Sequence, residues 1–142
     1  MKLQTFIVCD DIRTEIGKKH SLIGVYDDRI LFNVTPDKKN TWPKQMKLGI
    51  FAKISFEELM PKSFSFKMKY NENDVPLGEG SLNIKESEKN KNKFIVAIVN
   101  NNFLFDQPGK IKFTFVFFDE NKNSIGSVSP DFELEVEELV VG

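Results

Sequence analysis

Cysteine and histidine are the scarcest reactive residues of this 142-residue sequence, which contains one of each, Cys9 and His20. A single cysteine excludes a disulfide within the chain, and the two residues together cannot form a zinc site of Cys and His ligands. His20 falls at an expected hairpin tip, most of a strand away from Cys9, where it is solvated and has no orienting carboxylate. We therefore expect no catalytic residues and no enzyme activity.

Long apolar runs are also missing. No stretch approaches the ~20 apolar residues of a membrane-spanning helix. The apolar run before Cys9 is too short for a secretory leader, and Val8 is too bulky for the residue before a cleavage site. With one cysteine in the chain, these absences predict a soluble cytoplasmic protein without a membrane span.

Neither sign of charge is in excess. Twenty basic residues against 21 acidic ones leave a formal net charge of −1, whereas a general nucleic-acid binder needs clustered basic residues. The Lys-rich stretch 85–93 also contains Glu86 and Glu88, and we expect it to be a solvated loop. We expect neither nucleic acid as a partner nor a cofactor.

Phenylalanine, by contrast, is abundant, with 14 residues against one tryptophan and two tyrosines. It favours strands and fills the core between sheets. Apolar and polar residues alternate with a period of two along most of the chain, and helical periodicity is nearly absent. The segments with this pattern are 6–12, 22–32, 48–56, 62–70, 81–84, 94–99, 111–117 and 132–136.

Turn residues separate these segments, among them Gly17 and the Asn/Asp clusters at 71–74 and 119–123. Many short strands in a chain of this length predict one all-β domain over residues 1–142. We expect a two-sheet antiparallel β-sandwich, immunoglobulin-like or C2-like, with about eight strands. The irregular segment 33–45 should cross between the sheets.

The first predicted hairpin carries a resemblance. Its residues 9–15 (CDDIRTE), followed by residues 19–26 (KHSLIGVY), resemble the opening of a family of small bacterial β-sandwich proteins of unknown function. The matching residues span about the first 30 positions, and beyond them only the strand pattern agrees. The resemblance implies a fold and a bacterial or phage-related source, and it implies no activity.

This hairpin also concentrates aspartates, in two adjacent pairs. Several carboxylates in one region can bind a hard cation or act as an acid–base pair. Adjacent residues of a strand point to opposite faces, however, so neither pair can converge on one ion. Two nearby arginines favour cross-strand ion pairs instead. The candidate binding residues of this region are Asp10, Asp11, Arg13, Asp27, Asp28 and Arg29.

Residues Asp119, Asn121 and Asn123 have the spacing that opens a calcium-binding loop. Ser124 stands where such a loop needs glycine, and Pro130 stands where it needs a bidentate glutamate. We therefore expect a polar hairpin turn and no metal site. A calcium-dependent membrane- or glycan-binding sandwich remains the alternative function.

The only tryptophan, Trp42, lies in a loop that contains Pro36 and Pro43. Such a residue is a candidate ligand platform or interface anchor, although a plug at one end of the sandwich is the favoured interpretation. The leading hypothesis for function is a non-enzymatic binding or structural module, because sandwich domains present loops or edges to partners. An enzyme with an unrecognised site comes third.

Self-association is the remaining prediction. The segment 93–100 is apolar on both faces, and two residues add apolar bulk to the outer side of the strand at 111–117. An outer face in water needs a cover, which is either the Trp42 loop or a second copy in a homodimer. The candidate interface residues are Ile95, Ala97, Val99, Val116 and Phe118.

Overall fold

The computed structural model describes residues 1–57, 60–82 and 93–142, which form ten strands and one short 3-10 helix, η1 (Pro36–Lys38). In chain order the strands are β1 (Lys2–Glu15), β2 (Lys19–Tyr26), β3 (Arg29–Val34), β4 (Lys44–Ser55), β5 (Ser63–Tyr70), β6 (Asn73–Ser81), β7 (Lys93–Phe105), β8 (Gly109–Phe118), β9 (Ser124–Val128) and β10 (Leu134–Val140).

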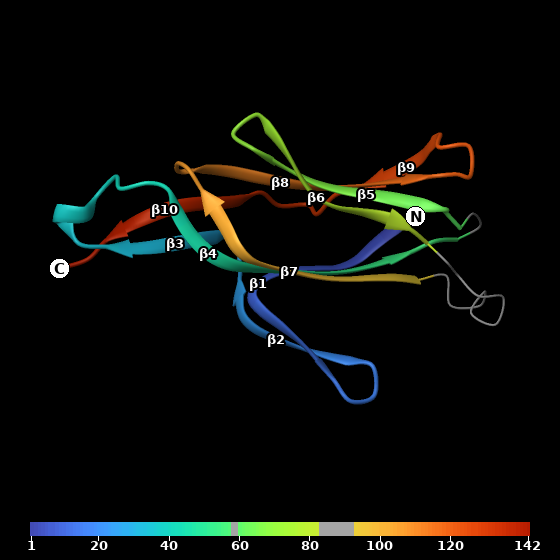
Figure 1. The fold of residues 1–142 in the computed structure, drawn as a ribbon, viewed down its shortest axis with the longest axis horizontal. Coiled ribbons are helices and arrows are strands. Elements are labelled where there is room, and N and C mark those ends of the chain that lie inside the picture. The colour runs from blue at the N-terminus through green and yellow to red at the C-terminus, as the bar shows by residue number, and fades with distance from the viewer. Residues whose placement is uncertain (58–59, 83–92) are drawn as a thin grey trace.

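The strands form two sheets that pack face to face (Figure 1). The four-stranded sheet has the order β2-β1-β4-β7, and the six-stranded sheet has the order β3-β10-β8-β5-β6, with β9 paired to β8. Neighbouring strands are antiparallel except β3 and β10, which run parallel. The predicted all-β sandwich is therefore confirmed, and the parallel pair is an addition to it.

Aromatic side chains fill the space between the sheets. Phe113, Phe115 and Phe117 all point inward from β8 and are buried. The ring of Phe115 stacks on that of Phe66 in β5, with centroids 4.0 Å apart and planes 5° from parallel. Phe6 of β1 reaches the same cluster from the other sheet, 4.9 Å from Phe113 between ring centroids. The phenylalanine-rich composition thus forms one core.

Two strands beyond the expected eight are present. The predicted strand 22–32 is two strands, because the chain bends at Asp27 and Asp28 and passes from one sheet into the other. The short β9 was not predicted, since serine and glycine make up most of it. The segment 33–45 crosses between the sheets as predicted, from β3 to β4.

Of the predicted strand 81–84 the structure describes only Ser81, which is the last residue of β6 (Asn73–Ser81), and Leu82, which follows that strand. β6 accommodates Pro76 because it lies at the edge of its sheet. Residues 83 and 84 lie outside the described residues, as does the Lys-rich stretch apart from Lys93. In the part of the chain that is described, no helix has the length and apolar character needed to cross a membrane.

Candidate functional site

The first hairpin projects from the four-stranded sheet. The first half of β1 pairs with β4, from Lys2 to Cys9, whereas its second half pairs with β2 alone. The resulting hairpin arm, residues 10–26, extends away from the six-stranded sheet (Figure 1). Gly17 and Lys18 form its turn with positive φ angles of 88° and 60°, as the predicted turn at Gly17 requires.

A hydrogen bond across the base of the arm joins Tyr26 to Asp10. The Tyr26 hydroxyl donates to the Asp10 carboxylate. Burial of the phenol, together with this bond and the charge of Asp10, raises the pKa of Tyr26 above its ordinary value, so the hydroxyl remains a donor. Gly24 lies beside this pair with a φ of 68°, and a Cβ there would collide with the Asp10 carboxylate. Any other residue would therefore be strained at this position.

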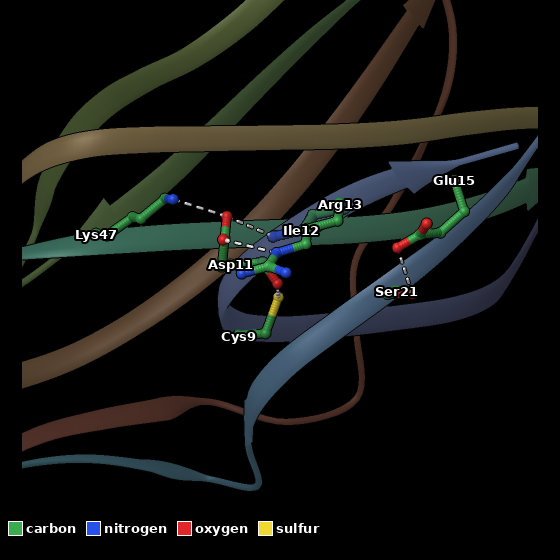
Figure 2. A network of polar contacts seen from close by, with 7 residues as sticks. All are labelled: Cys9, Asp11, Ile12, Arg13, Glu15, Ser21 and Lys47. Carbon is green, nitrogen blue, oxygen red and sulfur yellow. Dashed lines mark hydrogen bonds and ion pairs between the residues drawn. The ribbon is translucent and has the colours of Figure 1, made fainter.

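Asp11 ties the arm to β4 (Figure 2). Its Oδ1 lies 2.8 Å from the Lys47 Nζ and accepts a hydrogen bond of 2.9 Å from the Ile12 backbone amide. The Arg13 Nε lies 3.9 Å from the other carboxylate oxygen. The hydrogen bond from Lys47 is the main cause that lowers the pKa of Asp11. The Arg13 contact is within one strand, so the predicted cross-strand pair is replaced by the one with Lys47.

One face of the arm rests on the outer side of the four-stranded sheet. The His20 ring lies 5.3 Å from the Phe51 ring between centroids, and Ile12 packs so close to Gly49 that a Cβ there would lie 3.2 Å from the Ile12 Cγ1. The expectation of a solvated His20 is therefore wrong, because the arm inclines over β4 and half-buries the imidazole.

The opposite face of the arm exposes apolar side chains. Val25 is 55% exposed and Ile23 is 42% exposed, and they share a face of β2 because they are two residues apart. Ile16, next to the turn, is 95% exposed. None of the three was predicted as a binding residue, although an apolar residue beside Gly17 is a detectable signal, since a hairpin tip cannot reach the core.

The other acidic candidates lie elsewhere. Asp27 and Asp28 form the bend between β2 and β3, and the Asp28 carbonyl accepts a 2.8 Å hydrogen bond from the Glu135 amide. Arg29 begins β3 opposite Glu135. Within the described residues, no hydrogen bond or ion pair joins these side chains to the aspartates of the arm, and no group of three or more His, Cys, Asp or Glu could hold a metal ion.

Cys9 is fully buried at the start of the arm. Its Sγ donates a hydrogen bond of 3.4 Å to the Asp11 carbonyl. Burial is the main cause that raises the pKa of the Cys9 thiol, which therefore stays neutral at physiological pH. Cys9 acts here as a small packing residue.

Trp42 closes one end of the core. Its indole meets Phe32 edge-on, with ring centroids 6.0 Å apart, and the Lys44 Nζ lies 5.3 Å from the indole centroid. Lys44 also forms a largely buried ion pair of 3.1 Å with Glu138 of β10. The Asn40 amide donates to Glu138 over 2.8 Å, and this bond, followed by Lys44, lowers the pKa of Glu138. The Trp42 loop is thereby anchored to the six-stranded sheet.

The turn between β8 and β9 contains Asp119. Its Oδ1 accepts hydrogen bonds of 2.9 Å from the amides of Asn121 and Asn123. This carboxylate therefore stabilises its own polar turn.

The candidate interface residues lie on two separate surfaces. Ile95, Ala97 and Val99 point outward from β7 in the four-stranded sheet. Val116 and Phe118 point outward from β8 in the six-stranded sheet, where Phe118 lines a hollow of about 540 Å³. One flat contact cannot cover both sets, because the two outer faces lie on opposite sides of the sandwich.

Comparisons with known proteins give one match. No curated protein and no solved structure matches the chain. A family model matches residues 4–126, which include the hairpin arm. The matched region ends before β10, the strand that lies between β3 and β8 in the six-stranded sheet. The chain therefore belongs to DUF6941, a family of unknown function.

Proposed function

We propose that this protein is a non-enzymatic binding module that docks a protein partner through its hairpin arm. The observation that carries the proposal is the set of exposed apolar side chains on the arm, with Ile23 and Val25 on one face of β2 and Ile16 at the turn. Apolar anchors surrounded by polar side chains are typical of the centre of a protein–protein interface. Arg13 and Glu15 supply such polar surroundings, since both are exposed on the neighbouring strand.

The ties at the base of the arm support the same function. The Tyr26–Asp10 hydrogen bond, the Asp11–Lys47 ion pair and the contact of His20 with Phe51 hold the arm at one inclination to the sheet. An element held rigidly before binding loses less conformational entropy when its partner arrives. The free energy gained by burying apolar side chains is then available for affinity.

We also place this module in the cytoplasm, where a lone thiol such as Cys9 stays reduced. The calcium-dependent alternative is not proposed, because the Asp119 carboxylate accepts hydrogen bonds from its own turn.

Site-specific photo-crosslinking in the native host tests this proposal. A photoreactive residue placed at Ile16 or at Val25 should give the same protein adduct, whereas one at the exposed Asn121 of the β8–β9 turn should not. Val25→Lys should weaken binding of that partner by about 2 kcal/mol, roughly thirtyfold in affinity, with the β circular-dichroism signal retained. Asn121→Lys is the matched control. Adducts at the arm no more abundant than those at Asn121 would refute the proposal.

A further inference from the structure

β7 is an outer strand of the four-stranded sheet. It pairs with β4 along its whole length: Lys93 lies opposite Ser55 at one end, and Phe105 lies opposite Lys44 at the other. On its other side the described residues contain no strand. Among the described residues, the backbone amides and carbonyls that point to that side therefore have no strand partner, as in an open sheet edge.

This edge lacks the features that normally block pairing with another chain. Charged side chains, proline, bulges and short length are the common means of protecting an edge. β6 contains Pro76 and a register shift, and β3 is short. The segment 94–99 of β7, FIVAIV, contains no charged residue, proline or glycine, and the register is regular until the shift that follows Asn100.

We propose that β7 pairs antiparallel with β7 of a second copy around a two-fold axis at Ala97, which joins two four-stranded sheets into one of eight strands. In this register Ala97 faces Ala97 of the partner subunit. Ile95 lies opposite Val99 of the partner subunit, and Val96 lies opposite Ile98 of the partner subunit. Apolar side chains thus meet apolar side chains on both faces of the sheet.

The match of side-chain types selects this axis. With Ala97 at the centre, both flanking pairs join an isoleucine to a valine, and Lys93, the one charged residue of β7, lies opposite Asn101 of the partner subunit. An axis at Val96 would instead place Ile95 opposite the smaller Ala97 of the partner subunit and Lys93 opposite Val99 of the partner subunit. The strand is therefore its own complement, which makes a second copy the fitting occupant. Pairing around one two-fold axis uses the β7 edge of both copies, so the assembly closes as a dimer.

This interface leaves the hairpin arm free. The arm is built from β1 and β2, and β4 lies between β1 and β7 in the sheet. The dimer uses Ile95, Ala97 and Val99 of the predicted interface and excludes Val116 and Phe118, which lie on the other sheet.

Light scattering after gel filtration at micromolar concentration provides the test. The wild-type protein should have a mass of about 33 kDa, twice the 16.4 kDa of one copy. Ala97→Lys and Ala97→Glu should each give a 16.4 kDa monomer, because like charges then meet at the axis. Mixing the two variants should restore the dimer, since lysine then faces glutamate. Ala97 is exposed, so both variants should fold.

Two controls separate this inference from the proposed function. Leu104→Lys adds the same charge to β7 at a side chain that is 57% exposed, beyond the register shift, and should remain a dimer. Val25→Lys should also remain a dimer. A monomeric wild-type protein, an Ala97→Lys dimer, or a mixture that fails to pair would each overturn the proposed interface.

Discussion

Phe115 lies at the centre of the core, and its truncation to alanine should remove a large part of the stability of the protein. The side chain is fully buried. It stacks on Phe66 with ring centroids 4.0 Å apart and also meets the Phe6 ring at 6.3 Å. Loss of a buried phenylalanine side chain costs roughly 3–5 kcal/mol. Since the free energy of unfolding of a whole domain is only about 5–15 kcal/mol, Phe115→Ala should remove a large fraction of it.

The matched control is Thr114, the residue before Phe115 in the strand. Thr114 points to the outer face of β8, where its hydroxyl lies 3.2 Å from the Ser129 hydroxyl. Loss of one such exposed hydrogen bond costs about 1 kcal/mol or less. Urea unfolding followed by circular dichroism gives both free energies from the midpoint and the slope. Phe115→Leu, which leaves a smaller cavity, should have an intermediate cost and serves if the alanine variant does not fold.

The stacked pair provides a second readout. In a double-mutant cycle, Phe66→Ala and Phe115→Ala together should cost about 0.5–1.5 kcal/mol less than the sum of the single changes. Strict additivity would mean that the two rings do not interact. Equal costs for Phe115→Ala and Thr114→Ala, or costs in the reverse order, would refute the inward orientation assigned to Phe115.

Two further predictions concern the base of the arm and the Trp42 loop. Gly24→Ala should destabilise the protein by roughly 1–3 kcal/mol in thermal melting, because alanine is strained at a positive φ and its Cβ meets Asp10. Adding Asp10→Ala to the same chain should recover part of this loss of stability. A Gly24→Ala variant as stable as the wild type would contradict the geometry described for this position. The folded-state pKa of Glu138 lies below its ordinary value of 4.5, so its contribution to stability is present above that pH and is lost as the pH falls toward the folded value. Glu138→Gln should therefore flatten the acid side of the stability–pH curve, and an acid side identical to that of the wild type would contradict this role.

The period-two pattern was sufficient to predict most strands and the core face of β8, because a half-buried strand shows its orientation in its own sequence. It did not predict the division of 22–32 into β2 and β3, since the change of sheet at Asp27 and Asp28 depends on contacts with β10. β9 has too few apolar residues for a periodic signal. The parallel pairing of β3 with β10 joins segments far apart in the chain, which local patterns do not report.

The candidate site was predicted in part. The sequence pointed to Asp10 and Asp11 but not to Lys47. Lys47 lies on β4, far from Asp11 in the chain, and the pairing of β1 with β4 brings its ammonium group to the Asp11 carboxylate. Alternation indicates which side chains share a face of one strand, and it does not indicate in which sheet that strand lies. For that reason Val116 and Phe118 were grouped with β7 residues that lie on the opposite side of the sandwich.

The position of β10 affects the order in which the protein can assemble. During synthesis, the four strands of one sheet are complete once β7 has been made, whereas β3 has no neighbour in its own sheet until β10 follows. Ile30 on β3 is buried in the finished fold. Its side chain therefore cannot reach its final buried position until the segment from Val34 to Leu134 has been made. Pairing across so long a loop is slow, because loop-closure entropy must be overcome before the contacts form. On the ribosome the six-stranded sheet is therefore the late half of the molecule, and nascent chains that end before β10 expose an unpaired strand to chaperones.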